Sequence, residues 1–209
     1  MLPTLEPGDL VAGEVHPRRT ASSVERGDVV VFGGFVKRVI GLPGERVEMR
    51  GGSPVINGWQ VPDCDAGEYL YVQGGVGDLA IHGHLHVEFI GDRAYLTVHS
   101  LTRPFPDGYV VKAGEVFVLG DDRGNSVDSR TYNGGHGGGV SMDAVDARIG
   151  RFLVGTHRNG EPDFGRLLRP VDGLQARVRL EGLDVTALDE GVARCLANRP
   201  VVTRPPITF

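Results

Sequence analysis

The chain has 209 residues, of which 40% are hydrophobic and 23% charged, and its formal net charge is −5. These values are typical of a globular protein with one substantial domain, or with a core and a smaller lobe, and they argue against wholesale disorder. The negative charge and the lack of a long Lys/Arg run argue against nucleic acid as the main partner. Thirty-two glycines and 13 prolines, with few aromatic residues, favour a turn-rich β-protein over a helical bundle.

Membrane and redox signals are weak in this sequence. It contains no stretch of about 18 or more apolar residues and no basic and apolar leader at its start, so we expect the chain as given to be soluble if Met1 is its true start. The two cysteines, Cys64 and Cys195, could form one long-range disulfide, but the sequence favours two unpaired buried thiols.

Short β-branched runs bounded by glycine predict strands along the first 120 residues. A hairpin turn is predicted at Asn57-Gly58, because this dipeptide suits the backbone angles of a two-residue turn. A further hairpin is predicted from two runs joined by residues 112–115. The predicted strands are residues 28–32, 36–40, 47–49, 53–59, 79–89, 94–98, 109–111 and 116–119.

Helices are predicted at only two places. A short one covers residues 141–147 with Ser141 as its N-cap, and a longer one covers 187–197, where four residues share an apolar face. These four are Leu188, Val192, Cys195 and Leu196. The glycine-rich segment 133–139 predicts a flexible loop, and the proline-broken segment 199–209 an extended tail. We predict an all-β core of residues 1–50 and 109–165, a β-rich inserted lobe of 51–108 and a C-terminal extension of 166–209.

Four sequence segments stand out by their order. They are residues 1–9 (MLPTLEPGD), 26–32 (RGDVVVF), 36–45 (VKRVIGLPGE) and 120–130 (GDDRGNSVDSR). Together they resemble the conserved boxes of type I signal peptidases, the membrane-anchored proteases that remove leader peptides from exported proteins. The resemblance spans residues 1 to about 155 and implies a signal-peptidase-like antiparallel β-sheet core, with a β-rich insertion and a short C-terminal helical or extended appendage.

The resemblance implies that Lys37 is the general base of a Ser–Lys dyad. A free lysine, with a pKa of ~10.4, is neutral in only a few molecules per ten thousand at pH 7, so a shift to ~7 removes a penalty of roughly 4–5 kcal/mol. Burial among apolar groups produces such a shift, and Lys37 stands between Val36 and Val39 in a predicted strand. Lys37 and Arg38 point to opposite faces of that strand, so Lys37 can enter an apolar site alone. The alternative is an ordinary exposed strand lysine.

The box at residues 120–130 supplies candidate supporting residues. The resemblance implies that Ser126 orients the lysine amine. Asp128 and Arg130 are a close charge pair that could fix the loop, with Arg38 as an additional partner. The alternative is a surface turn with incidental charges. Asp122 departs from the family pattern, which usually has asparagine there, and this changes the charge near the loop.

The first box predicts part of a substrate pocket. In the family pattern, the residues after the nucleophile line a small apolar pocket that selects alanine-like residues before the cleavage site. Met1, Pro3 and Leu5 correspond to them, and Val36 is a further candidate for the wall. Ordinary core packing is the alternative, and the two roles are compatible.

The nucleophilic serine of the family pattern would stand immediately before Met1, so the chain as given lacks it and is expected to be inactive. Our leading hypothesis is a signal peptidase I whose true start lies upstream, with a membrane anchor and the catalytic domain on the extracytoplasmic side. Its partners would be preprotein leader peptides and the membrane surface, without nucleic acid or a cofactor. The alternative is a catalytically dead paralogue that binds leader peptides or is structural. A self-cleaving repressor-type protease fits the 120–130 box less well, whereas a pilin- or conjugation-specific relative shares the boxes.

A last feature is a histidine-rich strand. His82, His84 and His86 alternate, with His99 nearby, and alternating histidines bind zinc or nickel in some proteins. No carboxylate or thiol completes the set by spacing, so we interpret them as an exposed polar face and predict no metal site.

Overall fold

The computed structural model describes residues 1–15, 24–73, 79–101, 105, 107–156, 161–171, 174, 185–201 and 203–205. Strands dominate the described part of the chain, and every pair of named strands is antiparallel. The prediction of an all-β protein is therefore confirmed. No helix in the described ranges is long and apolar enough to cross a membrane.

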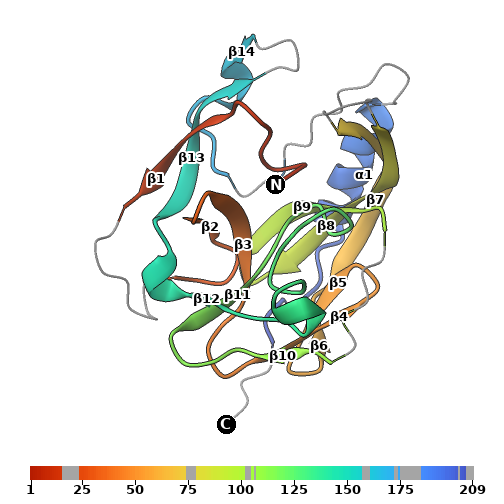
Figure 1. Ribbon diagram of the computed structural model, residues 1–209. Helices are drawn as coiled ribbons and strands as arrows, with labels where there is room; N and C mark the ends of the chain where they lie inside the picture. Colours follow the sequence, from red (N-terminus) through yellow and green to blue (C-terminus); the bar gives the residue numbers. More distant parts are fainter. Residues whose placement is uncertain are drawn as a thin grey trace.

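The largest sheet has seven strands in the order β1-β13-β2-β3-β11-β12, with β14 paired to β13. Figure 1 shows β1 and β13 side by side as a long arm, and the N-terminus lies between β13 and helix α1. Four of these strands, β1, β12, β13 and β14, lie outside the strand predictions. The bounds are β1 Leu10–Glu14, β2 Val29–Phe32, β3 Phe35–Gly41, β11 Glu115–Leu119, β12 Val140–Ser141, β13 Ala147–Thr156 and β14 Pro162–Asp163.

A second sheet has the order β10-β4-β5-β6. Its β5–β6 hairpin turns at Asn57 and Gly58, which both have positive φ, so the predicted turn is confirmed. The hairpin predicted between 109–111 and 116–119 is wrong, because β10 pairs with β4 whereas β11 pairs with β3 in the larger sheet. The bounds are β4 Arg46–Arg50, β5 Ser53–Ile56, β6 Trp59–Gln60 and β10 Tyr109–Val110.

The third sheet has the order β7-β8-β9 and packs against helix α1 (Val185–Ala197). Its strands are β7 Asp63–Gln73, which was not predicted, β8 Leu79–Ile90 and β9 Arg93–His99. Leu85, Val87 and Leu188 belong to the core between sheet and helix. A Cβ on Gly191 would lie 1.8 Å from the carbonyl oxygen of Ala66, so the helix needs glycine there to approach β7 this closely. The three sheets do not test the proposed division into core and lobe, which stays a prediction.

Cys64 on β7 and Cys195 on α1 form a disulfide, with their Cα atoms 5.7 Å apart. The prediction of unpaired thiols is therefore wrong. The two cysteines are 131 residues apart in the sequence, and only the packing of α1 on β7 brings them together. Cys195 is nevertheless fully buried, as expected for a core residue.

The helix predictions are confirmed in part. α1 spans the predicted segment and buries Leu188 and Cys195, but Leu196 is 36% exposed and lies off the buried face. The predicted helix at 141–147 is only a 3-10 turn over Met142–Ala144, and Ser141 makes no capping hydrogen bond. Residues 133–139 include a 3-10 turn over Asn133–Gly135, and the side-chain amide of Asn133 donates a hydrogen bond to the Gly137 carbonyl. Only part of the predicted extended tail lies within the described residues.

Candidate active site

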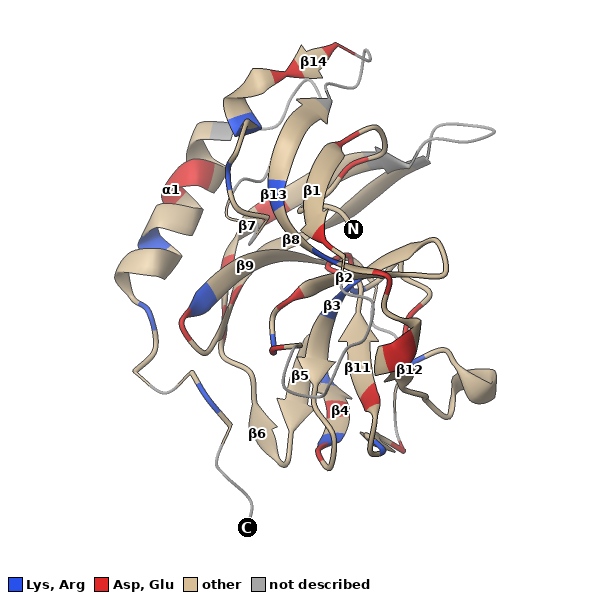
Figure 2. Cartoon of the chain, turned by 90° about the vertical axis from the view of Figure 1, so that its left-hand side faces the viewer, with Lys and Arg blue, Asp and Glu red and all other residues tan. Residues whose placement is uncertain are grey.

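Strand β3 presents Lys37 and Arg38 to different surroundings, as the alternation of a strand predicts. Lys37 lies opposite Val30 and Arg38 opposite Val29 in the β2–β3 pairing. Arg38 is fully buried, whereas Lys37 is half-buried and lines a groove. Figure 2 shows basic and acidic segments close together near the start of the chain, around β2 and β3.

The groove beside Lys37 has a volume of about 380 Å³. Three of the four predicted pocket residues, Met1, Leu5 and Val36, lie on its wall. Pro3 does not: it is buried in the turn closed by the hydrogen bond from the Leu5 N–H to the Met1 carbonyl (3.1 Å), and Leu2 takes the place on the wall. The described residues of the lining are Met1, Leu2, Leu5, Glu6, Pro7, Gly34, Phe35, Val36, Lys37, Tyr71, Asp122 and Asn125.

The pKa of Lys37 is lowered from its ordinary value, chiefly because burial disfavours the charged amine. Asp128 and Asp121 act against this shift by raising the pKa, and Arg130 adds to it. The ammonium lies 6.0 Å from the centroid of the Phe35 ring. Lys37 therefore loses its proton more readily than an exposed lysine does.

Ser126 and Lys37 both approach Gly120, but no hydrogen bond joins the serine hydroxyl to the lysine amine within the described residues. A Cβ on Gly120 would be 2.2 Å from the Ser126 Oγ and 3.6 Å from the Lys37 Nζ, so both atoms crowd the same side of Gly120. The buried Ser126 hydroxyl helps to lower the pKa of Asp128 but makes no hydrogen bond of normal geometry within the described residues. Gly120 is thus required by close approach, since any side chain would displace Ser126.

Asp128 and Arg130 form the predicted pair. Arg130 donates from Nε to Oδ1 (2.8 Å) and from NH2 to Oδ2 (2.7 Å), and the Gly120 backbone N–H donates to Oδ2 (3.0 Å). Burial alone would raise the pKa of Asp128, but these bonds hold it below its usual value. The pair ties the two ends of the loop together, and so fixes Gly120 beside Ser126.

Arg38 supports the same loop through a different partner from the one expected. Its guanidinium bonds Asp121 in a bidentate pair (2.8 and 2.7 Å), while the Thr4 hydroxyl donates to the same carboxylate. It also donates to the Gly27 carbonyl and lies 4.1 Å from the centroid of the Tyr95 ring. Arg38 thus connects the box at residues 1–9 to the box at 120–130, and it does not pair with Asp128.

A second buried arginine, Arg123, was missed by the sequence analysis. It forms a two-point pair with Glu88 of β8, whose pKa it helps lower to about 2 against the opposing effect of burial. It also donates to the carbonyls of Gly52 and Gly120. The backbone of Val98 accepts from the Arg123 N–H and donates to the Asp121 carbonyl (both 2.9 Å). The loop is therefore fastened to the β7–β9 sheet as well as to β3.

The segment after β14 supplies another buried arginine, Arg166. It donates to Asp9 (2.6 Å) and to the Thr4 carbonyl (3.3 Å), and its guanidinium lies 4.3 Å from the centroid of the Phe152 ring. These contacts hold residues 4–9 against β13. No sequence signal predicted this role, because Arg166 stands in the C-terminal extension, 157 positions from Asp9.

Asp122, the departure from the family pattern, faces the groove and accepts a hydrogen bond from the Tyr71 hydroxyl and another from the Asn125 N–H (3.1 Å). Burial raises its pKa, while these bonds partly offset the shift. Tyr71, which reaches the groove from β7, was not among the predicted site residues.

The antiparallel β-fold and the half-buried lysine on the wall of a groove agree with the resemblance of the sequence boxes. Comparison with known proteins agrees: the sequence model of the family described as signal peptidase, peptidase S26, matches residues 1–153. The chain belongs to this family.

The chain is similar to several curated signal peptidases. It is 33% identical over 141 residues to signal peptidase IB of Staphylococcus aureus, covering 63% of this chain and 64% of that protein. It is 32% identical over 155 residues to signal peptidase I of Pseudomonas aeruginosa, covering 64% and 52%. It thus spans less than two thirds of the length of these relatives. A crystal structure of a signal peptidase I from Enterococcus faecalis matches with 25% identity, 60% and 95% coverage and a TM-score of 0.31.

Proposed function

We propose that this protein is a signal peptidase I, a serine endopeptidase that cleaves N-terminal leader peptides from exported preproteins. The observation that carries the proposal is Lys37: a half-buried amine with a lowered pKa on the wall of a groove, close to Ser126. A neutral lysine can take the proton of a serine hydroxyl, which is a poor nucleophile without such a base.

The nucleophile in this proposal is the serine that stands immediately before Met1 in the family pattern. Met1 lines the same groove as Lys37, and its backbone nitrogen is near enough for the charges of Asp121 and Lys37 to affect its pKa. A residue joined to that nitrogen would therefore begin beside the lysine.

The reaction then follows acyl-enzyme logic. Lys37 takes the proton as the serine oxygen attacks the scissile carbonyl, and returns it to the leaving amine as the peptide bond breaks. Water deacylates the ester with Lys37 again as base. Ser126 is the group that we propose to orient the amine, and the Asp128–Arg130 and Arg38–Asp121 pairs hold the loop that carries it.

The groove supports a preference for small apolar residues on the acyl side of the scissile bond. The aliphatic part of its wall, formed by Met1, Leu5 and Val36, offers apolar contact to such a side chain. We propose that leader peptides are the partners, at a membrane surface, with the catalytic domain on the extracytoplasmic side.

The test compares the polypeptide of residues 1–209 with two extended forms. One carries a Ser-x-Ser extension before Met1, and the other carries Ser-x-Ala, in which only the residue directly before Met1 is changed from Ser to Ala. Cleavage of a synthetic leader peptide is followed by mass spectrometry. We expect cleavage only when serine directly precedes Met1. Equal cleavage by the unextended polypeptide would show that the nucleophile is elsewhere. Binding of the peptide without cleavage by any form would favour the alternative of a leader-peptide-binding paralogue.

A further inference from the structure

One face of the β7–β9 sheet carries a set of imidazoles and carboxylates that the proposed protease does not use. Leu85 and Val87 of β8 belong to the core under α1. Because side chains alternate along a strand, His84, His86 and Glu88 lie on the opposite face. Strand pairing adds neighbours from both sides: β7 places Asp65 opposite His86, and β9 places His99 opposite His84.

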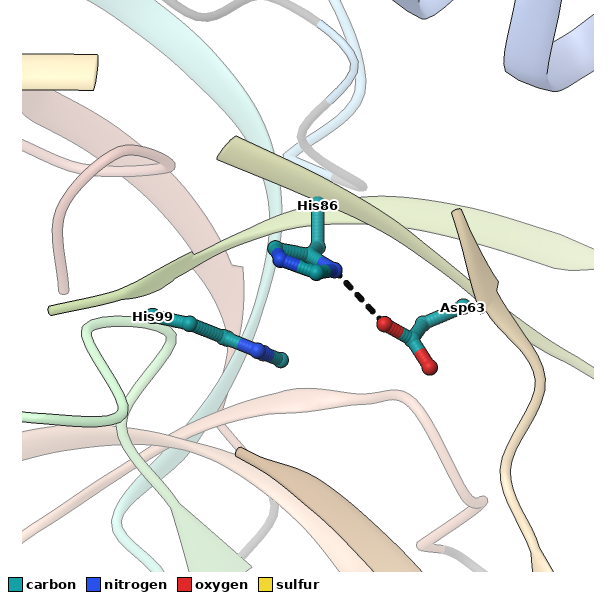
Figure 3. A group of neighbouring side chains, drawn as sticks. All are labelled: Asp63, His86 and His99. Atoms are coloured by element: carbon teal, nitrogen blue, oxygen red, sulfur yellow. Dashed lines mark hydrogen bonds and ion pairs between the residues drawn. The ribbon is translucent and has the colours of Figure 1, made fainter. Parts of the chain in front are cut away.

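Three of these side chains converge. Asp63, His86 and His99 each offer a ligand atom, and these atoms all lie within 4.8 Å of one another. Figure 3 shows the carboxylate and the two rings facing a common space. The His86 Nδ1 and the Asp63 Oδ2 are 2.6 Å apart, and the rings of His86 and His99 stack with centroids 4.0 Å apart. Their side chains are 15–19% exposed, which leaves an ion access from solvent.

Neighbouring groups orient all three side chains. The Ser53 hydroxyl donates to the Asp63 Oδ1 (3.0 Å), and the His99 Nε2 contacts the Thr97 hydroxyl (3.2 Å) and lies 3.8 Å from Glu88. A Cβ on Gly52 would lie 2.3 Å from the His99 Nδ1, so glycine there makes room for the ring. Such outer hydrogen bonds are the usual support of metal-binding residues.

We propose that Asp63, His86 and His99 bind one divalent transition-metal ion, with Zn²⁺ the best match to two imidazoles and a carboxylate. Ligand distances of about 2.0–2.2 Å require Asp63 to move away from its contact with His86, and the stacked rings must turn so that their in-plane lone pairs converge. Water completes the tetrahedron. The prediction of no metal site rested on the lack of a carboxylate at a suitable spacing, and the pairing of β7 with β8 supplies it.

The site stands apart from the groove, since none of its three ligands lines it. It nevertheless connects to the loop of residues 120–130. His99 follows Val98, which bonds the backbone of Asp121 and Arg123, and Glu88 lies beside His99 while pairing with Arg123. A bound ion would join β7, β8 and β9 at the point where the sheet holds this loop, and its role is therefore structural.

The test uses the tag-free chain of residues 1–209, treated with a chelator and then titrated with Zn²⁺ against a chromogenic competitor. We expect one equivalent to bind, and Asp63→Asn, His86→Gln and His99→Gln each to weaken binding at least about tenfold. His84→Gln is the matched control: it removes an exposed histidine from the same strand and face, with its own partner Asp65 (2.9 Å), and should change the affinity less than about twofold.

Ser53→Ala covers the case in which a ligand variant fails to fold, because it keeps all three ligands and loses only the bond to Asp63. It should weaken binding about tenfold. Zn²⁺ should also raise the Tm of the unsubstituted chain and of His84→Gln. The proposal would be overturned if the chain bound no Zn²⁺ with a Kd below about 10 µM. It would also be overturned if Ser53→Ala and the folded ligand variants kept the Zn²⁺ affinity of the unsubstituted chain.

Discussion

The two faces of β3 give two adjacent basic residues, Lys37 and Arg38, opposite environments. On the interior side, Arg38 is completely buried but bonds a carboxylate at two points and stacks on Tyr95. On the groove side, Lys37 is half-buried, and no carboxylate of the described residues lies within ion-pair distance of its amine. The charge of Arg38 is stabilised by Asp121, whereas burial makes the ammonium of Lys37 easier to deprotonate.

The difference follows from the chemistry of the two side chains. A guanidinium stays charged and offers a planar fork to a carboxylate, so it suits a fixed structural pair. An ammonium loses its proton when it is desolvated, so it suits a base. We propose that the buried pairs fix the loop beside the groove, and that Lys37 has a lowered pKa because it is buried without such a partner.

The largest expected effect comes from removing the amine. In the polypeptide with serine before Met1, Lys37→Met should lower kcat for leader-peptide cleavage on the order of 10⁴-fold, because the general base is lost. Its free energy of unfolding should not fall, since methionine is not penalised by burial. Lys112→Met, which removes an exposed lysine, is the control and should keep full activity. Residual activity of Lys37→Met near that of Lys112→Met would rule out the general-base role.

On the interior side, Arg38→Met should lower the free energy of unfolding by about 3–5 kcal/mol, because it leaves Asp121 buried without its partner. Urea unfolding measures this loss. Arg46→Met removes an exposed pair with Glu48 and should cost less than about 1 kcal/mol. Equal losses in the two variants would mean that the buried pair has no special place in stability.

The disulfide extends the comparison to a region far from β3. Cys64→Ala, Cys195→Ala and the double variant should each lower the free energy of unfolding by about 2–4 kcal/mol, because either single change opens the same covalent loop. A double variant that loses twice as much as a single one would contradict the cross-link, as would an unsubstituted chain that is unaffected by reduction.

A smaller effect is expected from Gly120→Ala, which crowds the groove side. The added Cβ would overlap the Ser126 Oγ and should cost about 1–3 kcal/mol, with a loss of cleavage as Lys37 loses its neighbour. Gly150→Ala is the control, since a Cβ there meets nothing within 4 Å, and it should stay within about 0.5 kcal/mol of the parent. If Gly120→Ala is as stable and active as Gly150→Ala, the close approach of Ser126 is not required.

The motifs predicted the local part of this arrangement. Short segments were enough to predict a strand at Lys37, the Asp128–Arg130 pair and helix α1. The ordered boxes indicated that Ser126 lies close to Lys37. Strand alternation was enough to separate Lys37 from Arg38.

The long-range contacts could not be predicted in the same way. Arg123 meets Glu88, Arg166 meets Asp9, and Cys64 meets Cys195 only after separate sheets and a helix have packed, and no periodicity marks such partners. The same holds for Asp63, which joins His86 and His99 through the pairing of three strands. Sequence patterns report which face a residue takes, whereas tertiary packing decides what it meets there.

The lowered pKa of Lys37 is the centre of this account, and NMR can measure it directly. The chain has only two lysines, Lys37 and the exposed Lys112, so selective ¹³C labelling of lysine gives two side-chain signals, assigned by Lys112→Met. A pH titration should show Lys37 losing its proton below the ordinary lysine value of 10.5, because burial favours the neutral amine. A Lys37 titration at or above 10.5 would contradict the account.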